Sequence, residues 1–299
     1  MPELPEVQTI VNDLQILTGD TITGFWTDFE KAIKTKDFEK EVVGRKIKSI
    51  QRLSKNIIIE LSSKNAIIIH LKMTGKLLLN FQFPISNFQI NPNSKIFKQN
   101  AAEFHKQYPY FHHIFFLKKH GALVFSDIRK FATLELISLE KLSQIEKTKG
   151  VDPFSKNFTL QTFSRIISEH KNKTRHSRVT GKNIKSLLMN QAAIAGIGNI
   201  YASEIPYDAK LNPLRKLSGL TNKEIKLLHH SVLRILTKAI KMRGTSISDY
   251  RDANGKKGGF QNQLKVYGKA GKKCHKCGTI IAKEIVEQRS TFYCPTCQK

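Results

Sequence analysis

Residues 46–73, KIKSIQRLSKNIIIELSSKNAIIIHLKM, predict β-structure and decide how the first half of the chain folds. β-Branched and other apolar residues fill the runs Lys46–Leu61 and Ala66–Met73, and a Ser-Ser-Lys-Asn turn separates them. Two later runs, His112–Leu117 and Ala122–Phe125, are separated in the same way by a Lys-Lys-His-Gly turn. Because short turns join neighbouring antiparallel strands, the first half is predicted to be a mainly antiparallel β structure.

Helical patterns flank this β region. From Glu6 to Leu17, apolar residues recur at three- and four-residue intervals, which places them on one face of a helix. After about residue 140, helices are predicted over Leu160–His170, Asn183–Ile194 and Thr221–Met242. The last of these begins with a Thr-Asn-Lys-Glu capping-box pattern. The predicted fold class is therefore α+β.

Two segments have no clear period. Asn80 to Tyr110 carries prolines, asparagines and scattered aromatic residues and is predicted to be a long loop. Gly244 to Gly259 is rich in Gly, Lys and Asp and is predicted to be mobile. A short tail that contains cysteines follows it and ends the chain.

The composition is that of a strongly basic protein with room for about two domains. The 50 Lys and Arg residues exceed the 24 Asp and Glu residues, which gives a formal net charge of +26. At ~150 residues per domain, 299 residues with 40% apolar content allow two hydrophobic cores. No apolar run approaches the roughly 18 residues of a membrane span, and Glu3 and Glu6 stand where a secretory signal would carry basic residues. The chain is expected to be a soluble cytosolic protein with no membrane partner.

The charge suits a polyanionic partner. Nucleic acid and acidic lipid head groups are both candidates, and a lysine-rich surface also arises from solvation alone. Composition does not choose among these three, so the motifs have to decide.

The four cysteines form the most specific pattern in the chain. Cys274-His-Lys-Cys277 and Cys294-Pro-Thr-Cys297 are two CxxC turns with sixteen residues between them. Two such turns can supply four thiolates to one tetrahedral zinc ion, and a tail this short needs the metal as its core. Two disulfides are the alternative, which a cytosolic location disfavours, and a redox pair would not explain the second turn. The tail is predicted to be a zinc ribbon with one structural Zn²⁺, and His275 is expected to be exposed rather than a ligand.

The N-terminal sequence Met1-Pro2-Glu3-Leu4-Pro5-Glu6 combines an amine with two carboxylates. A small residue after Met1 permits removal of the initiator, which would leave Pro2 with a free secondary amine. An α-amino group titrates near ~8 and lysine near ~10.4, so more of the terminal amine is unprotonated at neutral pH and able to attack carbonyl carbons. Glu3 and Glu6 lie three residues apart at the start of a helix, where both can approach the amine and one could transfer protons. Acidic residues are also common in a first helical turn for structural reasons alone.

The segment Gly196-Ile-Gly-Asn199-Ile-Tyr-Ala-Ser-Glu204 lies between two helical patterns. Its glycines allow close approach of the backbone, and a turn that opens into a helix presents unpaired N–H groups that suit a phosphate. Packing of one helix on another explains the same glycines. The basic composition and the zinc ribbon favour the phosphate interpretation.

Taken together, these motifs make the chain resemble the formamidopyrimidine-DNA glycosylases, bacterial enzymes related to endonuclease VIII. The resemblance follows the family's order and covers nearly the whole chain apart from residues 80–110. The motifs that carry it are Pro2–Glu6, Ile68–Gly75, Ser126–Phe131, Gly150–Pro153, Gln191–Glu204, Gln263–Gly268 and Gln288–Gln298.

The resemblance implies a three-part architecture. Residues 1–140 would form a catalytic β-sandwich domain with a leading helix, and residues 141–245 a helical domain with a helix-two-turn-helix motif. Residues 246–299 would form a lesion loop and a β-hairpin zinc finger. Damaged double-stranded DNA would bind between the halves, and the enzyme is expected to be a monomer in the bacterial cytosol, associated with the nucleoid.

The resemblance also implies a reaction. Pro2 would attack C1′ of a damaged nucleotide and form an imine, Glu3 would protonate the sugar ring oxygen, and Glu6 would support them. The expected lesions are oxidised purines, namely 8-oxoguanine and formamidopyrimidines. β- and then δ-elimination would cut the strand without a catalytic metal.

Other family motifs imply contacts with DNA. Met73, Arg129 and Phe131 would fill the gap left by the extruded base. Gly244–Gly258 would close over that base.

Phosphates beside the lesion are expected to bind basic and amide side chains. Lys55, Asn199 and Arg289 would hold these phosphates, and Lys55 and Arg289 would also donate protons during elimination. His70 is expected to contribute to DNA binding. Each phosphate contact adds affinity that falls as salt rises.

The chain departs from the family pattern at a few positions. Ile128 stands where the family usually has Pro, and Ala132 where it has Gly. Gly150-Val-Asp-Pro lacks the usual Pro after the Gly, and the loop at residues 80–110 is longer than expected. None of these changes touches the expected catalytic groups.

Three other functions are compatible with parts of the sequence. An endonuclease VIII-like enzyme would prefer oxidised pyrimidines, but Arg129, Phe131 and the long Gly244–Gly258 segment favour the purine-repair type. A non-catalytic zinc-ribbon protein that binds DNA or RNA would not require a free Pro2. A membrane-surface protein lacks support, because no amphipathic anchor helix is evident.

Overall fold

A computed structural model of the chain describes residues 1–79, 106, 108–171 and 183–299. The predicted loop Asn80–Tyr110 therefore lies almost wholly outside the described residues. The described residues form two compact units. The first unit comprises Met1–Pro2, Glu6–Ile145 and Arg243–Gly258, and the second comprises Glu3–Pro5, Glu146–Met242 and Gly259–Lys299.

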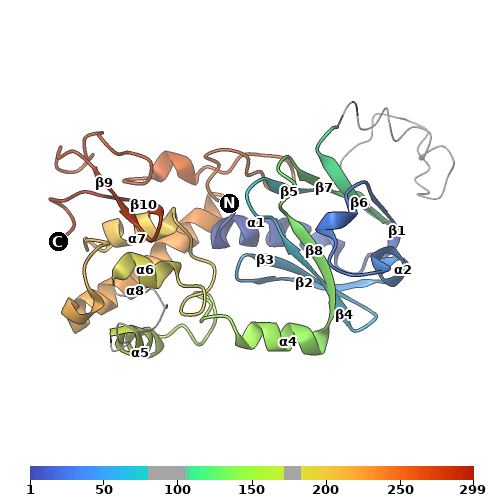
Figure 1. Cartoon of the computed structure of the whole chain (residues 1–299), viewed down its shortest axis with the longest axis horizontal. Helices are drawn as coiled ribbons and strands as arrows, with labels where there is room; N and C mark the ends of the chain where they lie inside the picture. Colours follow the sequence, from blue (N-terminus) through green and yellow to red (C-terminus); the bar gives the residue numbers. More distant parts are fainter. Residues whose placement is uncertain (80–105, 107, 172–182) are drawn as a thin grey trace. The chain divides into compact units, whose positions relative to one another are not determined.

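The first unit is a β-sandwich of two four-stranded antiparallel sheets (Figure 1). One sheet has the strand order β1-β6-β7-β5 and the other has the order β2-β3-β4-β8. Apolar side chains from all eight strands contribute to one buried core, and Ile114, Phe116, Ala122 and Val124 of β6 and β7 form a second, smaller cluster. The strands are β1 (Ile22–Thr27), β2 (Ile47–Leu53), β3 (Asn56–Leu61), β4 (Asn65–His70), β5 (Gly75–Leu79), β6 (Phe111–Leu117), β7 (Gly121–Asp127) and β8 (Thr133–Ser138).

The register of β3 and β4 shows why the decisive stretch folds as a hairpin. Ile57 pairs with Ile69 and Ile59 pairs with Ile67, and all four side chains are buried. Cross-strand pairs of β-branched residues pack well on a pleated surface. The predicted antiparallel β structure is confirmed, but the run Lys46–Leu61 forms two strands, β2 and β3, that pair with each other across a turn at Ser54 and Lys55.

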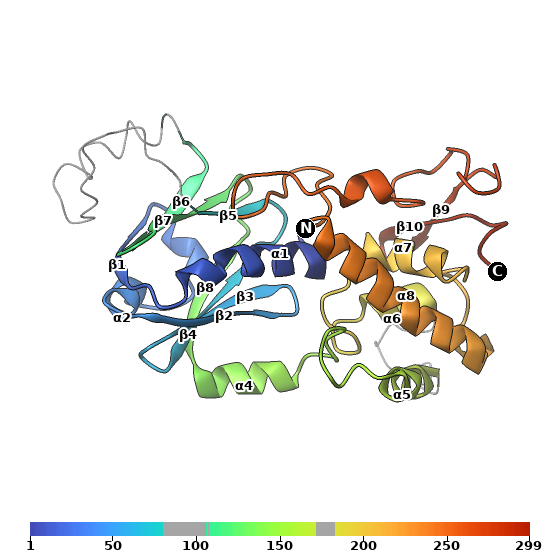
Figure 2. The same ribbon diagram turned by 180° about the vertical axis from the view of Figure 1, so that it is seen from behind.

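The predicted N-terminal helix is also confirmed. Helix α1 (Leu4–Leu14) continues into the 3-10 turn η1 (Gln15–Leu17). Its apolar face, Val7, Ile10, Val11 and Leu14, is buried in the sandwich core. Figure 2 shows the helix lying along the sandwich.

Three strands of the first unit were not predicted. β1 carries Gly24 at a register shift, which weakens its apolar pattern. β5 alternates buried and half-buried side chains over five residues, and β8 has only three buried side chains among six, so each presents few apolar positions to a sequence pattern. The short elements α2 (Phe38–Val42) and η2 (Glu30–Ala32) were not predicted either.

The second unit is mainly helical and has its own buried core. Helix α4 (Leu139–Lys147) lies where the chain passes from the first unit to the second, between Ile145 and Glu146. The helices and 3-10 turns that follow are α5 (Leu160–Lys171), α6 (Ile184–Met189), α7 (Tyr201–Asp208), η3 (Leu217–Gly219), α8 (Asn222–Lys241) and η4 (Phe260–Gln263). Thr221 and Glu224 form a full capping box at the start of α8, as predicted.

The predicted helix Asn183–Ile194 is shorter than expected. Asn183 caps α6 through its side chain, but the helix ends at Met189. Asn190 then adopts an extended conformation, and its side chain accepts a hydrogen bond from the backbone N–H of Ala192 at 3.0 Å. Asparagine competes for backbone donors in this way and ends helices.

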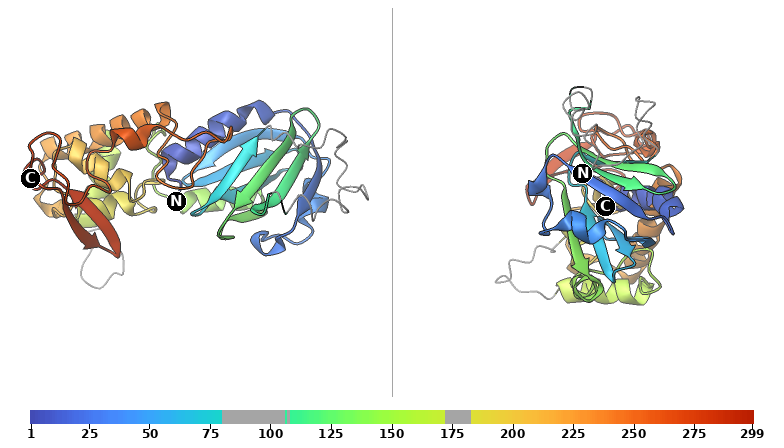
Figure 3. Two further views of the ribbon diagram at one scale, coloured as in Figure 1. Left: turned by 90° about the horizontal axis from the view of Figure 1, so that it is seen from above. Right: turned by 90° about the vertical axis from the view of Figure 1, so that its right-hand side faces the viewer.

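The chain ends in a β-hairpin, drawn in red in Figure 3. It consists of β9 (Ala282–Val286) and β10 (Arg289–Tyr293), which pair in antiparallel register. Glu287 and Gln288 both have positive φ angles, which is the backbone conformation of a tight two-residue hairpin turn. The mixed architecture, with sheets first, helices next and a hairpin last, confirms the α+β prediction.

The segment predicted to be mobile makes specific contacts in the first unit. Arg243 donates to the carboxylates of Asp13 and Asp252, with closest nitrogen–oxygen distances of 2.6 Å to each. The Asp252 carboxylate also accepts from the backbone N–H of Lys256, and the Leu79 N–H donates to Ala253 O at 2.7 Å. The segment is therefore anchored at its base and in its middle.

None of the helices that the structure describes combines the length and the apolar character needed to cross a membrane.

Candidate active site and metal centre

The Glu3 carboxylate is held by the backbone at the start of α7. Its side chain is 3% exposed. It accepts hydrogen bonds from the N–H groups of Gly198, Ile200 and Tyr201 at 2.7, 2.9 and 3.4 Å. The first N–H groups of a helix have no partner within the helix and carry the positive end of its dipole, so a carboxylate suits them. The orientation of Glu3 is therefore fixed by the second unit itself.

The glycines of this turn have a different role from the one predicted. A Cβ atom at Gly198 would lie 2.4 Å from Glu3 Cδ, so only glycine lets the carboxylate reach the backbone. Gly196 has a φ of +88° and contacts Leu4. The N–H groups that the sequence suggested for a phosphate are thus occupied by Glu3.

Glu6 binds a separate set of groups in the first unit. It is 1% exposed, and its Oε1 accepts from the N–H of Thr245 at 2.7 Å. A Cβ atom at Gly244 would lie 2.9 Å from the same oxygen. Glu6 therefore fixes the start of the Gly244–Gly258 segment. Pro2, which precedes Glu3, is also buried.

Lys185 is a buried cation that the sequence analysis missed. Its side chain is fully buried, and Nζ donates to Ser203 Oγ at 3.0 Å and to Asn199 O at 3.3 Å. Burial lowers the pKa of Lys185 to about 8, although the charge of Glu3 acts in the opposite direction. A lysine inside the apolar run Ile184–Met189 was the available signal.

Asn199 and Arg289 approach the same aromatic residue in the second unit. The Asn199 side chain hydrogen-bonds the Tyr267 hydroxyl, and the positive charge of Arg289 acts on that phenol. Burial is the main cause that raises the pKa of Tyr267, and the charge of Glu3 adds to it. Tyr267, to which no role was assigned from the sequence, therefore lies within electrostatic range of Glu3 and Arg289.

The loop that carries Arg129 and Phe131 is fixed by one buried carboxylate in the first unit. Asp127 is 4% exposed and accepts from the N–H groups of Arg129, Phe131 and Ala132 at 3.2, 2.8 and 2.8 Å. The Thr74 hydroxyl also donates to Asp127. These bonds define the loop although Ile128 and Ala132 replace the family's usual Pro and Gly.

The side chains expected to enter DNA are exposed. Met73 is 43% exposed and Phe131 is 53% exposed, although both are large and apolar. The Arg129 guanidinium lies 4.9 Å from the centre of the Phe131 ring, within the range of a cation–π contact.

Two further predicted residues lie at turns of the same unit. His70 Nδ1 accepts from the N–H of Lys72 at 3.0 Å and so fixes the turn that leads to Met73. Lys55 lies in the tight turn between β2 and β3, next to Ser54 with a φ of 58°, and is 8% exposed.

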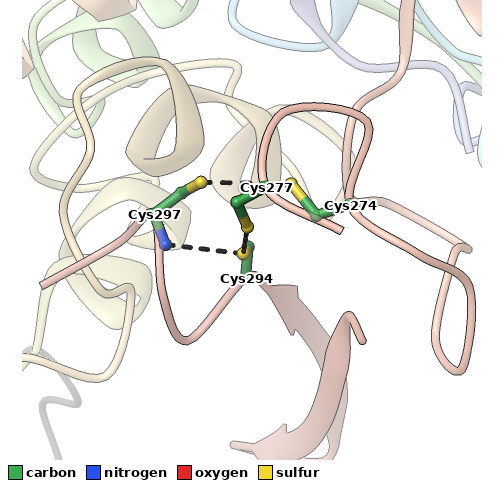
Figure 4. A group of neighbouring side chains, drawn as sticks. All are labelled: Cys274, Cys277, Cys294 and Cys297. Carbon is green, nitrogen blue, oxygen red and sulfur yellow. Dashed lines mark hydrogen bonds between the residues drawn. The ribbon is translucent and has the colours of Figure 1, made fainter. Parts of the chain in front are cut away.

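The four cysteines converge as predicted, and the structure supports a metal centre rather than disulfides (Figure 4). Their sulfurs all lie within 4.8 Å of one another, with Cys277 Sγ 3.4 Å from Cys294 Sγ and Cys274 Sγ 4.0 Å from Cys297 Sγ. Four sulfurs at ~2.3 Å from a tetrahedral zinc ion would be roughly 3.8 Å apart. His275 is exposed and is not part of this cluster, as expected.

The chemistry of the sulfurs also fits a cation. Burial, followed by hydrogen bonds with the neighbouring sulfurs, raises the pKa of Cys297 to about 12. Burial also opposes ionisation of Cys274, but hydrogen bonds, led by the one with Tyr207, outweigh it and lower the pKa of Cys274 to about 6. Four closely packed thiols therefore do not all ionise at neutral pH by themselves, whereas a bound zinc ion deprotonates its thiol ligands.

Comparison with known proteins places these features in a family. The chain matches the model of the formamidopyrimidine-DNA glycosylase N-terminal domain over residues 1–134, that of the formamidopyrimidine-DNA glycosylase H2TH domain over residues 150–251, and that of a zinc finger found in FPG and IleRS over residues 271–299. Formamidopyrimidine-DNA glycosylases from Pelotomaculum thermopropionicum and Streptococcus mutans are each 35% identical to it, covering all of this chain and 99% and 100% of the relative.

Solved structures agree with the sequence relatives. The Lactococcus lactis Fpg in complex with DNA that contains an abasic site is 33% identical, with a TM-score of 0.80 over 99% of both chains. The Lactococcus lactis protein with DNA containing an oxidised pyrimidine, and MutM with DNA containing carbocyclic 8-oxo-G, each give 33% identity and a TM-score of 0.79 over the whole of both chains.

Proposed function

The chain belongs to the formamidopyrimidine-DNA glycosylase family and is a DNA glycosylase of base excision repair that acts on damaged DNA, and from this we propose that it is bifunctional. It removes oxidised purines, namely 8-oxoguanine and formamidopyrimidines. It then cuts the strand at the resulting abasic site by β,δ-elimination through an imine with Pro2.

The observation that carries this proposal is the fixed Glu3 carboxylate directly after Pro2. A general acid or base must be held in place beside the reacting atoms. Three backbone N–H groups do this for Glu3. Once Met1 is removed, the amine of Pro2 is one peptide unit from that carboxylate.

The proposed first step breaks the bond between the sugar and the base. The Pro2 nitrogen attacks C1′, the C1′–base bond breaks, and the proton that the Pro2 nitrogen loses goes to the departing base. Glu3 protonates the sugar ring oxygen, so the ring opens and an iminium forms between Pro2 and C1′. Glu6 supports the site through the backbone of Thr245.

The proposed second step cuts the strand. The iminium withdraws electrons from C2′, so a C2′ proton is lost and the 3′ phosphate leaves; a second elimination then releases the 5′ phosphate. Lys55 and Arg289 hold these phosphates and donate protons to them, and Asn199 contributes a further phosphate contact. Hydrolysis of the remaining imine frees Pro2.

The damaged nucleotide must leave the duplex before Pro2 can reach C1′. Extrusion costs a few kcal/mol, and the exposed Met73, Arg129 and Phe131 fill the space it leaves. Their exposure in the described structure supports this role, because large apolar side chains usually avoid water. His70 supports the turn before Met73, and Gly244–Gly258 closes over the extruded base.

Borohydride trapping tests the proposal directly. The purified protein is incubated with a duplex that carries a single 8-oxoguanine opposite cytosine, borohydride is added, and any covalent adduct is mapped. We expect an adduct on Pro2 and none with Pro2→Gly or with a form that retains Met1. An adduct on a lysine instead would overturn the assignment of the nucleophile.

The same experiment separates a second candidate function. The Lactococcus lactis protein was solved with DNA containing an oxidised pyrimidine, so this chain could prefer that lesion class. An adduct with an oxidised pyrimidine but not with 8-oxoguanine would favour this second function. Trapping on neither lesion and on no abasic site, with Pro2 free and zinc bound, would contradict both.

A further inference from the structure

Tyr207, in the last turn of α7, contacts the metal centre. Its hydroxyl oxygen lies 3.5 Å from Cys274 Sγ and 3.4 Å from His275 Nδ1. The tyrosine and histidine rings also meet, with centroids 5.8 Å apart. All three residues belong to the second unit, and neither the zinc ligand set nor the proposed reaction uses Tyr207.

The direction of these hydrogen bonds follows from counting protons. A phenol carries one proton, and a thiolate bound to zinc carries none. With zinc bound, Tyr207 is therefore the only group that can donate in its contact with Cys274. Its oxygen then has to accept in the second contact, which requires an N–H at Nδ1 of His275.

We propose that Tyr207 is a positioning residue of the metal centre, which donates a hydrogen bond to the Cys274 thiolate and ties α7 to the zinc ribbon. A hydrogen bond to a coordinating sulfur fixes its orientation and draws charge from it. Such outer contacts commonly change metal affinity by about 10–100-fold. Two hydrogen bonds thus follow one another: His275 Nδ1–H donates to the Tyr207 oxygen, and the Tyr207 hydroxyl donates to the Cys274 thiolate.

Helix α7 makes two more sets of hydrogen bonds, which connect the Tyr207 contact to other parts of the second unit. At its start, the N–H groups of Ile200 and Tyr201 hold Glu3. At its centre, the Glu204 carboxylate accepts hydrogen bonds from three consecutive backbone N–H groups, those of Lys265, Val266 and Tyr267. These residues lie in the segment that leads to the ribbon. One helix thus joins a buried carboxylate at one end to a zinc-bound sulfur at the other.

The variant Tyr207→Phe tests the proposal, because it removes only the hydroxyl and keeps the ring. In the cobalt-substituted protein, we expect the sulfur-to-cobalt charge-transfer absorption to move to lower energy, since the sulfur regains charge. In the zinc protein, competition with a chromogenic chelator should show affinity weakened by about 10-fold.

Tyr293→Phe is the matched control. Tyr293 directly precedes Cys294, but its hydroxyl donates to Glu284 Oε1 at 2.6 Å and not to a sulfur. We expect its cobalt spectrum to match the wild type. Equal spectral shifts in the two variants, or no shift and less than about a twofold change of zinc affinity in Tyr207→Phe, would overturn the proposal.

A measurement on the unmodified zinc protein keeps the proposal testable if the variant does not fold. Nitrogen-15 NMR of the histidine rings reports which ring nitrogen carries the proton. We expect the neutral His275 ring to be protonated at Nδ1. A proton at Nε2 alone would overturn the proposal, because the single phenol proton would then point to the histidine and not to Cys274. None of these readouts depends on the glycosylase or strand-cutting activity.

Discussion

Glu3 and the cysteine cluster both gather polar groups that need partners, but they are completed in different ways. The Glu3 carboxylate receives three N–H groups from the protein's own backbone. The four cysteine sulfurs lie within 4.8 Å of one another and need a cation that the protein does not provide. The first site is therefore complete once the second unit has folded, whereas the second is complete only when metal is bound.

The hydrophobic cores around the two sites also differ in whether they need the metal. The helical core that holds Glu3's partners is large and apolar. The core of the ribbon consists of Val266, Cys274, Ile281, Phe292 and Cys294, so two of its five buried members are metal ligands. Loss of the metal removes part of the ribbon's core, while loss of the carboxylate leaves the helical core intact.

The largest effect is expected for Cys294→Ser. Structural zinc contributes on the order of 10 kcal/mol to the folding of small metal-dependent domains, so the ribbon should lose both zinc and structure. DNA affinity should fall with it, because Arg289 lies on the ribbon hairpin. Atomic absorption and DNA titration measure the two losses. A variant that still holds one zinc per chain would show that the ribbon assignment is wrong.

A smaller and more local effect is expected for Glu3→Gln. The amide keeps only one of the two acceptor oxygens and transfers protons poorly, so base release should slow by about 10²–10⁴-fold. Zinc content and DNA affinity should be unchanged, which separates this site from the ribbon. Single-turnover release of 8-oxoguanine measures the rate. The matched control is the exposed Glu41→Gln, and an unchanged rate in Glu3→Gln would remove Glu3 from the proposed mechanism.

The buried Lys185 of the second unit should make the free energy of unfolding depend on pH. Burial lowers its pKa to about 8 in the folded state, whereas an unfolded lysine titrates near ~10.4. Between these values the unfolded chain binds more protons, so this group makes stability rise with pH. The free energy of unfolding of the wild type relative to Lys185→Met should increase by on the order of 3 kcal/mol from pH 8 to pH 10.5.

Urea unfolding at several pH values in this window measures the Lys185 effect. The exposed Lys223→Met serves as the control, and its difference from the wild type should not vary with pH. A flat difference for Lys185→Met as well would mean that Lys185 titrates normally.

The smallest effect is expected for Thr221→Ala. It removes the cap at the start of α8, which should lower the free energy of unfolding by about 1 kcal/mol. Neither zinc content nor base release should change. Thr221→Ser retains the hydroxyl and should restore most of the stability in thermal unfolding; a loss as large as that of alanine would argue against the cap.

The two sites also differ in how far the sequence could predict them. The ribbon is local: the ligand types and their spacing specify a metal centre without any knowledge of the fold. The partners of Glu3 lie 195 to 198 residues away, so no local pattern links them. The Gly196–Glu204 segment was expected to offer N–H groups to a phosphate, and in the structure the N–H groups of Gly198, Ile200 and Tyr201 bond Glu3.

The fold shows the same limit of local information. The regions of β2, β3, β4, β6 and β7 were predicted because continuous β-branched and apolar runs mark them, although β2 and β3 were expected as the single run Lys46–Leu61. β1, β5 and β8 were not predicted, and their apolar side chains gain their burial in the shared core of the first unit. Lys185 was missed because a single charge in an apolar run does not reveal that Ser203 and Asn199 will receive it. Burial and partners of this kind arise from tertiary packing.

Hydrogen bonds to the Asp127 carboxylate fix the loop, so its shape does not depend on a proline at position 128. The turn is encoded by Asp127 and Thr74, so a search for relatives that requires a proline at the next position would miss chains such as this one. Ile128 is also 42% exposed and adjacent to Arg129. It therefore offers an attachment point for an environment-sensitive fluorophore that would report, in real time, when the neighbouring side chains enter a duplex.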